Sequence, residues 1–184
     1  MKKLLILIPA IIITIAISAS LAAPHVQRAI YPLKYSTHIN NYSKELDLDP
    51  YLISAIIYEE SRFKKDSRSG AGALGLMQIM PETARWISNQ SKMELEDGSL
   101  LVPKENIALG TWYFNWLLDK YDNETRALAA YNGGENNIDA WLKRNGEISD
   151  EEFIKNIPFK ETRAYVERVK ISRSKYQDLY PEEF

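Results

Sequence analysis

The sequence predicts a mainly α protein, a compact bundle of short helices preceded by one N-terminal membrane-spanning helix. Three observations indicate this fold class. Apolar residues recur at helical spacing in several segments, many of these segments begin with a proline or a helix-capping residue, and the chain has neither a run of alternating strands nor an internal repeat. With 184 residues, the chain is long enough for one domain with a proper core.

The N-terminus predicts a membrane segment. Lys2 and Lys3 precede an uncharged apolar run, residues 4–24, and a helix needs about 20 such residues to cross a bilayer. The run also resembles a secretory signal, with small residues near 20–22 for cleavage. Both interpretations place the rest of the chain outside the cytoplasm, because the positive end stays inside. We expect a retained single-pass anchor, since the run is longer than most signal apolar regions; cleavage would give a secreted protein.

Asp49 and Pro50 predict the first helix of the folded part, as an N-cap followed by a proline at the first helical position. The next segment, 51–63, is periodic, and these apolar side chains gather on one side: Ile53, Ile56, Ile57 and Phe63. Glu60 falls near the centre of that apolar stripe and Glu59 towards its edge. A carboxyl placed among apolar groups has a raised pKa, which suits a general acid. The alternatives are that Glu60 pairs with a buried arginine or points to solvent.

Five further helices follow from similar signals. Pro81 and Pro103 each open one, and Asn123 caps another that Gly133 ends. The expected helical segments are 81–86, 103–121, 124–132, 136–146 and 161–180, with long loops around the glycines after residue 69 and at 93–102. The aromatic side chains of the second of these helices are expected in the core: Trp112, Tyr113, Phe114 and Trp116.

Composition excludes several kinds of site. The chain has no cysteine, and its two histidines, His25 and His38, both lie near the N-terminus, so we expect no metal cluster, cofactor or Ser-His-Asp triad. A formal net charge of −2 does not favour nucleic acid. Gly70, Gly72 and Gly75 match the dinucleotide fingerprint G-x-G-x-x-G, but they follow an amphipathic helix and not a strand, so we expect no nucleotide site.

Four motifs occur together in one order. They are Glu60-Ser61 at the end of a helix, SGAGALGLMQIMPETA from Ser69 to Ala84, AYNG from Ala130 to Gly133, and ETRAYV from Glu161 to Val166. In order and spacing they resemble the soluble lytic transglycosylase (SLT) domain family, a branch of the lysozyme-like superfamily. The resemblance covers roughly residues 35–180 and implies a lysozyme-like fold. Together with the apolar run, it divides the chain into an anchor or signal segment at 1–24, a juxtamembrane linker at 25–36 and a catalytic domain at 37–184.

The resemblance implies a peptidoglycan lytic transglycosylase with Glu60 as its catalytic residue. Glu60 would donate its proton to the glycosidic oxygen between N-acetylmuramic acid (MurNAc) and N-acetylglucosamine (GlcNAc). It would then act as base on the MurNAc 6-hydroxyl, which closes a 1,6-anhydro ring. The edge position of Glu59 and the Glu-Ser order both favour Glu60 over its neighbour. One carboxylate suffices because the second nucleophile belongs to the substrate, whereas ordinary glycosidases use two.

The resemblance also implies a set of substrate-binding residues: Ser69, Gln78, Met80, Tyr131, Asn132, Glu161 and Tyr165. Simpler roles compete with this one. Ser69 is also typical of a turn, Gln78 of a surface position, Met80 of core filling, Tyr131 and Asn132 of a helix end, and Glu161 of a favourable first-turn charge. Gly72 and Gly75 would allow close approach of a sugar, although tight turns also require glycine.

Two other functions stay open at this point. A lysozyme-type hydrolase of the same bond would leave reducing MurNAc ends, and a membrane-tethered peptidoglycan-binding protein would leave the bond intact. The expected partners are peptidoglycan glycan strands and, through the N-terminal helix, the membrane. We expect a monomer without nucleic acid or nucleotide ligands.

Overall fold

The computed structural model describes residues 24–146 and 148–184. The expected membrane segment therefore lies outside the described residues, apart from Pro24. Within the described part, no helix combines the length and the apolarity that a membrane crossing requires. The elements are α2 (Ser36–Glu45), α3 (Pro50–Ser61), α4 (Pro81–Ser91), the short 3₁₀ helix η1 (Ser99–Leu101), α5 (Pro103–Tyr121), α6 (Glu124–Gly133), α7 (Glu135–Asn145), α8 (Asp150–Asn156) and α9 (Lys160–Leu179). The prediction of a mainly α bundle is confirmed, since the described residues form no strand beyond isolated bridges.

The sequence signals for helix starts are confirmed. The Asp49 carboxylate accepts the backbone N–H of Tyr51 at 2.8 Å and so caps α3. Asn123 caps α6 by accepting the backbone N–H of Arg126 at 2.8 Å. Prolines occupy the first positions of α3, α4 and α5, where a missing N–H costs nothing.

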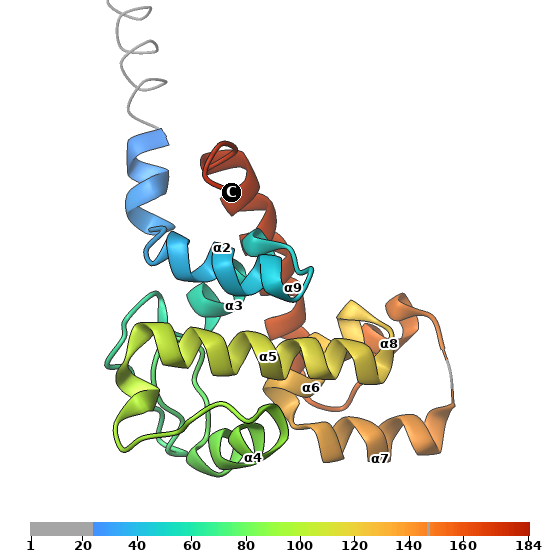
Figure 1. Cartoon of the computed structure of the whole chain (residues 1–184). Helices are drawn as coiled ribbons and strands as arrows, with labels where there is room; N and C mark the ends of the chain where they lie inside the picture. The colour runs from blue at the N-terminus through green and yellow to red at the C-terminus, as the bar shows by residue number, and fades with distance from the viewer. Residues whose placement is uncertain (1–23, 147) are drawn as a thin grey trace, which may run out of the picture.

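The buried helix α3 lies at the centre of the bundle. Its residues from Leu52 to Tyr58 are all buried, so the helix is enclosed on every side and not on one stripe. It packs along α9, while α5 packs against α2, α4 and α6. In Figure 1, the long α5 crosses the molecule between α2 and α3 above and α4 and α7 below.

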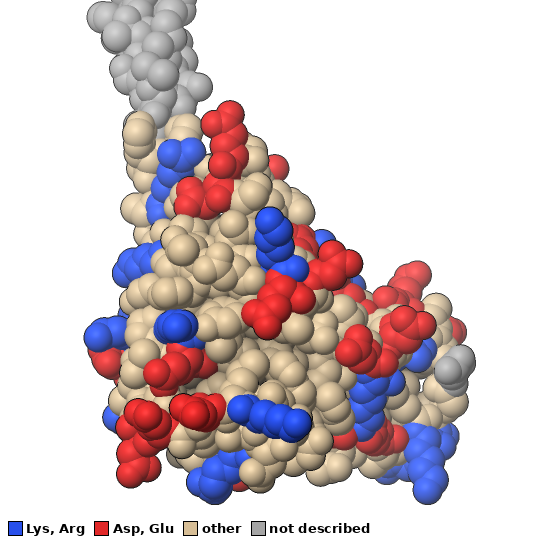
Figure 2. All heavy atoms as spheres, viewed as in Figure 1, with Lys and Arg blue, Asp and Glu red and all other residues tan. Residues whose placement is uncertain are grey.

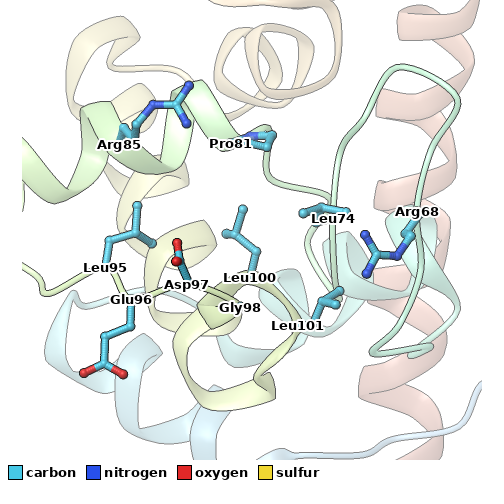
Figure 3. Close-up of a pocket in the computed structure, with 10 residues that line it drawn as sticks. All are labelled: Arg68, Leu74, Pro81, Arg85, Leu95, Glu96, Asp97, Gly98, Leu100 and Leu101. Atoms are coloured by element: carbon cyan, nitrogen blue, oxygen red, sulfur yellow. The ribbon is translucent and has the colours of Figure 1, made fainter.

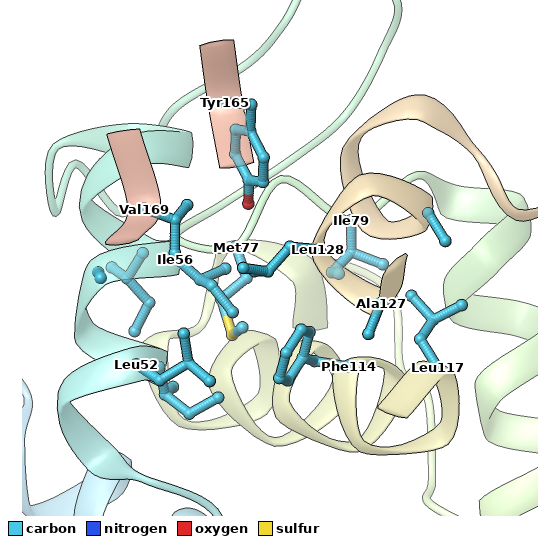
Figure 4. Close-up of a cluster of buried hydrophobic side chains, with 14 of the residues drawn as sticks. Leu52, Ile56, Met77, Ile79, Phe114, Leu117, Ala127, Leu128, Tyr165 and Val169 are labelled. Carbon is cyan, nitrogen blue, oxygen red and sulfur yellow. The ribbon is translucent and has the colours of Figure 1, made fainter. Parts of the chain in front are cut away.

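One hydrophobic core joins these helices to the loop that follows α3 (Figure 4). Met77 and Ile79 from that loop are buried among side chains of four helices: Leu52 and Ile56 of α3, Phe114 and Leu117 of α5, Ala127 and Leu128 of α6, and Tyr165 and Val169 of α9. The burial of these apolar groups holds the loop beside the end of α3.

The segment expected as a juxtamembrane linker is in large part ordered against the end of α9. Residues 24–30 are helical. The Arg28 guanidinium donates to the Leu179 carbonyl at 2.8 and 3.1 Å, and the Tyr180 hydroxyl donates to the Tyr31 carbonyl at 2.9 Å. The Tyr176 hydroxyl donates to the Pro32 carbonyl at 3.1 Å. The folded part therefore includes residues before Ser36.

Charges of both signs are distributed over the surface. Figure 2 shows lysines and arginines interspersed with aspartates and glutamates on the visible face, without a continuous field of one sign. This agrees with the formal net charge of −2 and gives this face no strong attraction for a polyanion.

Candidate active site

Glu60 lies in the last turn of α3, with its side chain partly buried. Burial raises the pKa of this carboxyl from its ordinary 4.5 to about 7, because it removes water from the charged form. The negative charges of Glu59 and Glu161 also raise the pKa, while the Tyr165 hydroxyl and the Arg168 charge oppose the rise. Near neutral pH, Glu60 is therefore present in both protonation states, as a group that first donates and then accepts a proton must be.

Replacing Glu60 by Gln is expected to stabilise the protein above about pH 7. The folded carboxyl keeps its proton to about pH 7 and the unfolded one only to about 4.5, so the folded state binds more protons within this window. Stability therefore falls as pH rises through it. Gln carries no charge and avoids this loss, with an expected gain on the order of 2 kcal/mol at about pH 8 and little change at about pH 4. Denaturant unfolding at both pH values measures this, and a pH-independent difference would contradict it.

Two tyrosine hydroxyls lie close to the Glu60 carboxyl. Burial raises the pKa of Tyr131 and of Tyr165 well above the ordinary value, and the Glu60 charge raises both further. The Tyr131 hydroxyl donates to the Met77 carbonyl at 2.8 Å. The buried Tyr165 hydroxyl has no hydrogen bond of ordinary geometry within the described residues, although it interacts with the Glu60 charge. Both phenols stay protonated at neutral pH and border the acid from α6 and α9.

The neighbouring carboxylate, Glu59, has a different environment. Its side chain is only 3% exposed, and three side chains hold it. Arg168 donates to it at 3.0 Å, Arg62 at 3.3 Å to each oxygen, and the Ser172 hydroxyl at 2.6 Å. These donors occupy both carboxylate oxygens and tie α3 to α9, so Glu59 has a structural position and Glu60 is the carboxyl available for proton transfer.

The loop after α3 uses two of the predicted substrate-binding side chains to hold itself. The exposed Ser69 exchanges hydrogen bonds with Ala73: the Ser69 hydroxyl accepts the Ala73 N–H at 2.9 Å, and the Ser69 N–H donates to the Ala73 carbonyl at 3.0 Å. Gln78, with φ of +48°, donates its side-chain amide to the carbonyls of Gly75 at 2.8 Å and Ser67 at 3.2 Å. The turn interpretation of Ser69 thus has direct support, and substrate contact by either residue stays a prediction.

Gly75 is required by protein packing, and its expected role in sugar approach stays a prediction. Its φ is +81°, and a Cβ there would lie 2.1 Å from the Leu100 carbonyl oxygen and 2.3 Å from the Asn106 side-chain nitrogen. Gly72 differs, since its φ is +96° and its Cβ direction is open. Position 75 therefore requires glycine, because any side chain there would overlap η1 and α5.

Asn106 is the supporting residue that sequence reasoning missed. Fully buried in α5, it accepts the Met77 N–H at 2.7 Å and donates to the carbonyls of Leu74 at 3.0 Å and Leu100 at 2.9 Å. It thus fixes the segment whose Met77 carbonyl receives Tyr131. The available signal was a single amide directly before the apolar residues 107–109 of α5, because a buried amide needs hydrogen-bond partners.

The remaining predicted residues come from α4, α6 and α9. Met80 precedes Pro81 as the N-cap residue of α4, and Asn132 lies in the last turn of α6 beside Tyr131. Glu161 is exposed in the first turn of α9, and its charge acts on Glu60. A Cβ on Gly133 would lie 2.9 Å from the Thr162 hydroxyl, so the end of α6 and the start of α9 are in close contact. This contact brings the last two motifs together near Glu60.

A separate pocket of ≈ 470 Å³ lies between the loop after α3, α4 and the segment that includes η1 (Figure 3). Leu74, Leu95 and Leu100 contribute apolar walls, with Arg68 and Arg85 at two sides. None of the residues predicted for the site lines this pocket. In the described part of the chain, no cluster of three or more His, Asp or Glu could hold a metal ion.

Comparisons with known proteins identify the family to which this chain is similar. The family model described as Transglycosylase SLT domain matches residues 37–154. The soluble lytic murein transglycosylase of Salmonella typhimurium is 37% identical over 146 residues, which are 76% of this chain and 22% of that protein. The chain thus spans about a quarter of the length of the relatives that it matches.

Two solved structures are similar in fold. An inactive glutamate-to-glutamine mutant of the lytic transglycosylase Slt from Pseudomonas aeruginosa superposes with a TM-score of 0.76 at 36% identity, over 81% of this chain and 25% of that one. The 70 kDa soluble lytic transglycosylase of Escherichia coli gives 0.77 at 31% identity, over 85% and 26%. The lysozyme-like SLT fold expected from the four motifs is therefore confirmed.

Proposed function

The chain belongs to the Transglycosylase SLT domain family, and from this premise we propose that it is a peptidoglycan lytic transglycosylase acting through Glu60. The observation that carries the proposal is one carboxyl whose pKa is raised to about 7 at the end of a buried helix, bordered by two protonated tyrosines. The inactive glutamate-to-glutamine mutant of the similar Pseudomonas enzyme supports the need for a glutamate in such a reaction. The bond to be cleaved is the β-1,4 bond between MurNAc and GlcNAc.

In the proposed reaction Glu60 donates one proton and then accepts another. As an acid it protonates the glycosidic oxygen, and the bond from that oxygen to the MurNAc anomeric carbon breaks. As a carboxylate it then takes the proton of the MurNAc 6-hydroxyl, whose oxygen bonds to the anomeric carbon and closes the 1,6-anhydro ring. Atoms and charge balance without water, and Glu60 regains its proton. A pKa close to the working pH serves both half-steps.

The other predicted residues are proposed to bind the glycan. The Tyr165 hydroxyl is placed to donate a hydrogen bond beside Glu60, whereas the Tyr131 hydroxyl donates to the Met77 carbonyl and would accept a hydrogen bond from the glycan. Asn132 and Glu161 lie at the contact of α6 and α9. Gln78, Met80 and Ser69 would line the approach from the loop side. For Gln78, Met80 and Ser69 the proposal rests on their match to the family's motif. The side chains of Gln78 and Ser69 already form hydrogen bonds to the backbone of the loop itself.

Digestion of purified peptidoglycan, followed by mass spectrometry of the released muropeptides, tests the function. We expect 1,6-anhydro-MurNAc ends that disappear in Glu60→Gln. Reducing MurNAc ends from the wild-type protein would instead support the lysozyme-type hydrolase. Intact glycan strands that sediment together with the protein would support the non-catalytic binding protein.

We further propose that the apolar run at 4–24 holds the catalytic domain at the outer face of the cell membrane as a single-pass anchor. The support is its length, its lack of charge and the lysines before it. The order of residues 24–33 against α9 would then keep the domain close to the bilayer. Extraction of membranes at high pH tests this: the anchored protein stays in the pellet, whereas release of a shortened chain into the medium would show a cleaved signal.

A further inference from the structure

Aromatic rings from three helices form a continuous group beside the candidate active site. Trp86 of α4 contacts Trp112, Tyr113 and Trp116 of α5 at ring-centroid distances of 5.9, 6.1 and 4.8 Å. Of the α5 aromatic residues expected in the core, Phe114 is fully buried, whereas these three are only partly buried. The core expectation is thus confirmed for Phe114, while Trp112, Tyr113 and Trp116 pack against the core as partly buried side chains. Partly buried rings leave an edge or a face for a ligand.

A groove of ≈ 280 Å³ opens on this group between α4, α5 and the start of α7. Its lining combines two aromatic rings with hydrogen-bonding side chains: Trp86, Tyr113, Glu82, Thr83, Glu135 and Asn136. Lys120 pairs with Glu135 and donates to Asp139 at 2.6 Å, which fixes one wall. An apolar face surrounded by hydroxyl, amide and carboxylate groups suits a ring that is apolar on one face and polar at its edge. The carboxylates disfavour an anionic ligand.

The groove is connected to Glu60 through aromatic contacts. The rings of Tyr113 and Tyr131 are 5.6 Å apart, and the Glu60 charge acts on the Tyr131 hydroxyl. Trp86 is therefore two ring contacts from the tyrosine that borders the acid. In Figure 1, α4 and α7 lie on the same side of α5, as a groove between them requires.

We propose that Trp86 and Tyr113 form a stacking subsite for an uncharged N-acetylhexosamine ring of the glycan strand, beyond the sugars held at Glu60. The inference rests on the proposed function for the identity of the strand. The subsite adds contact with a longer strand and no chemistry, so it makes binding depend on the number of sugar rings. Thr83 and Asn136 are placed to hydrogen-bond the hydroxyl and acetamido groups at the ring's edge.

The probe is the β-1,4-linked tetramer of GlcNAc, with the dimer as the short comparison, bound to the full chain carrying Glu60→Gln to prevent turnover. We expect Trp86→Ala in this background to weaken tetramer binding about tenfold and dimer binding less than about twofold by calorimetry. Trp86→Phe should retain most of the tetramer affinity. Trp112→Ala is the matched control, because Trp112 contacts Trp86 but does not line the groove. Tetramer affinity unchanged in Trp86→Ala, or lowered equally in Trp112→Ala, would overturn the subsite.

A second measurement needs no aromatic substitution. In the NMR spectrum of the same Glu60→Gln protein, the tetramer should shift the indole N–H signal of Trp86 and leave that of Trp141, buried against Phe153, unmoved. Anhydro ends from the wild-type protein without a shift at Trp86 would overturn the subsite alone. A shift at Trp86, together with a wild-type protein that cleaves no glycan, would overturn the proposed function alone.

Discussion

Replacing Glu60 by Gln is expected to reduce release of anhydro-muropeptides by about 10³-fold or more, because the same carboxyl supplies both the acid and the base step. Gln cannot transfer a proton, yet it keeps the size and most of the packing of the side chain. Glu60 lies in the last turn of α3, where burial keeps it partly protonated. The neighbouring Glu59 is held instead by Arg62 and Arg168. Initial rates of muropeptide release from purified peptidoglycan measure the loss.

Glu59→Gln is the matched control for this experiment. It removes a carboxylate that Arg62, Arg168 and Ser172 hold in place, so it should lower stability while the folded protein keeps its activity within about tenfold. Full activity in Glu60→Gln, or a greater loss in Glu59→Gln, would mean that the acid is assigned to the wrong residue.

The rate of the wild-type protein should also fall as pH rises through about 7, since the proton donor is then lost.

Gly75→Ala is expected to destabilise the protein by about 3 kcal/mol or more, from strain at a left-handed backbone position and from overpacking. The added Cβ would overlap the Leu100 carbonyl and the Asn106 amide. A hydrogen bond from the Asn106 amide to the Leu100 carbonyl joins these two groups. Neither neighbour can move without breaking the contacts that hold the loop. Urea unfolding should show a lower midpoint with an unchanged slope.

Gly70→Ala is the control within the same glycine motif. A Cβ at Gly70 meets no atom within 4 Å, and the residue is exposed, so its effect should stay within about 0.5 kcal/mol. Equal losses in the two variants would show that flexibility of the whole loop, and not close packing at Gly75, explains the glycines.

The central helices could be predicted because their signals are local. The Asp49-Pro50 start, the prolines at 81 and 103, and the Asn123 cap act through neighbouring backbone groups, and the structure has each helix where they indicate. The ends are less well determined: α4 extends to Ser91, beyond the expected Trp86, because nothing in the intervening sequence breaks a helix.

Helices α2 and α8 were not predicted, since few of their side chains are buried. Only Ile39 and Ser43 of α2 are buried, and only Phe153 of α8, so neither segment has a clear apolar stripe. The same reason applies to residues 24–30, whose order depends on the distant end of α9. Long-range packing of this kind leaves little periodicity in the sequence.

The catalytic acid could be predicted from the sequence, whereas the residues that position the site could not. The apolar residues around Glu60 in its own helix predicted a raised pKa, and the burial that raises it also involves Tyr131 of α6 and Tyr165 of α9. The residues that distinguish the two glutamates, Arg168 and Ser172, lie more than 100 positions away in the chain. Asn106 likewise reaches the loop from 29 residues away, and no local pattern indicates its partner.

The fold keeps Glu60 partly protonated near neutral pH, and a carbon-detected NMR titration of the glutamate side-chain carboxyls tests this most directly. The spectrum should contain one glutamate signal that titrates near pH 7 and that is absent from Glu60→Gln, while the Glu59 signal persists in both proteins. Titration of the Glu60 signal near the ordinary value of 4.5 would contradict the account.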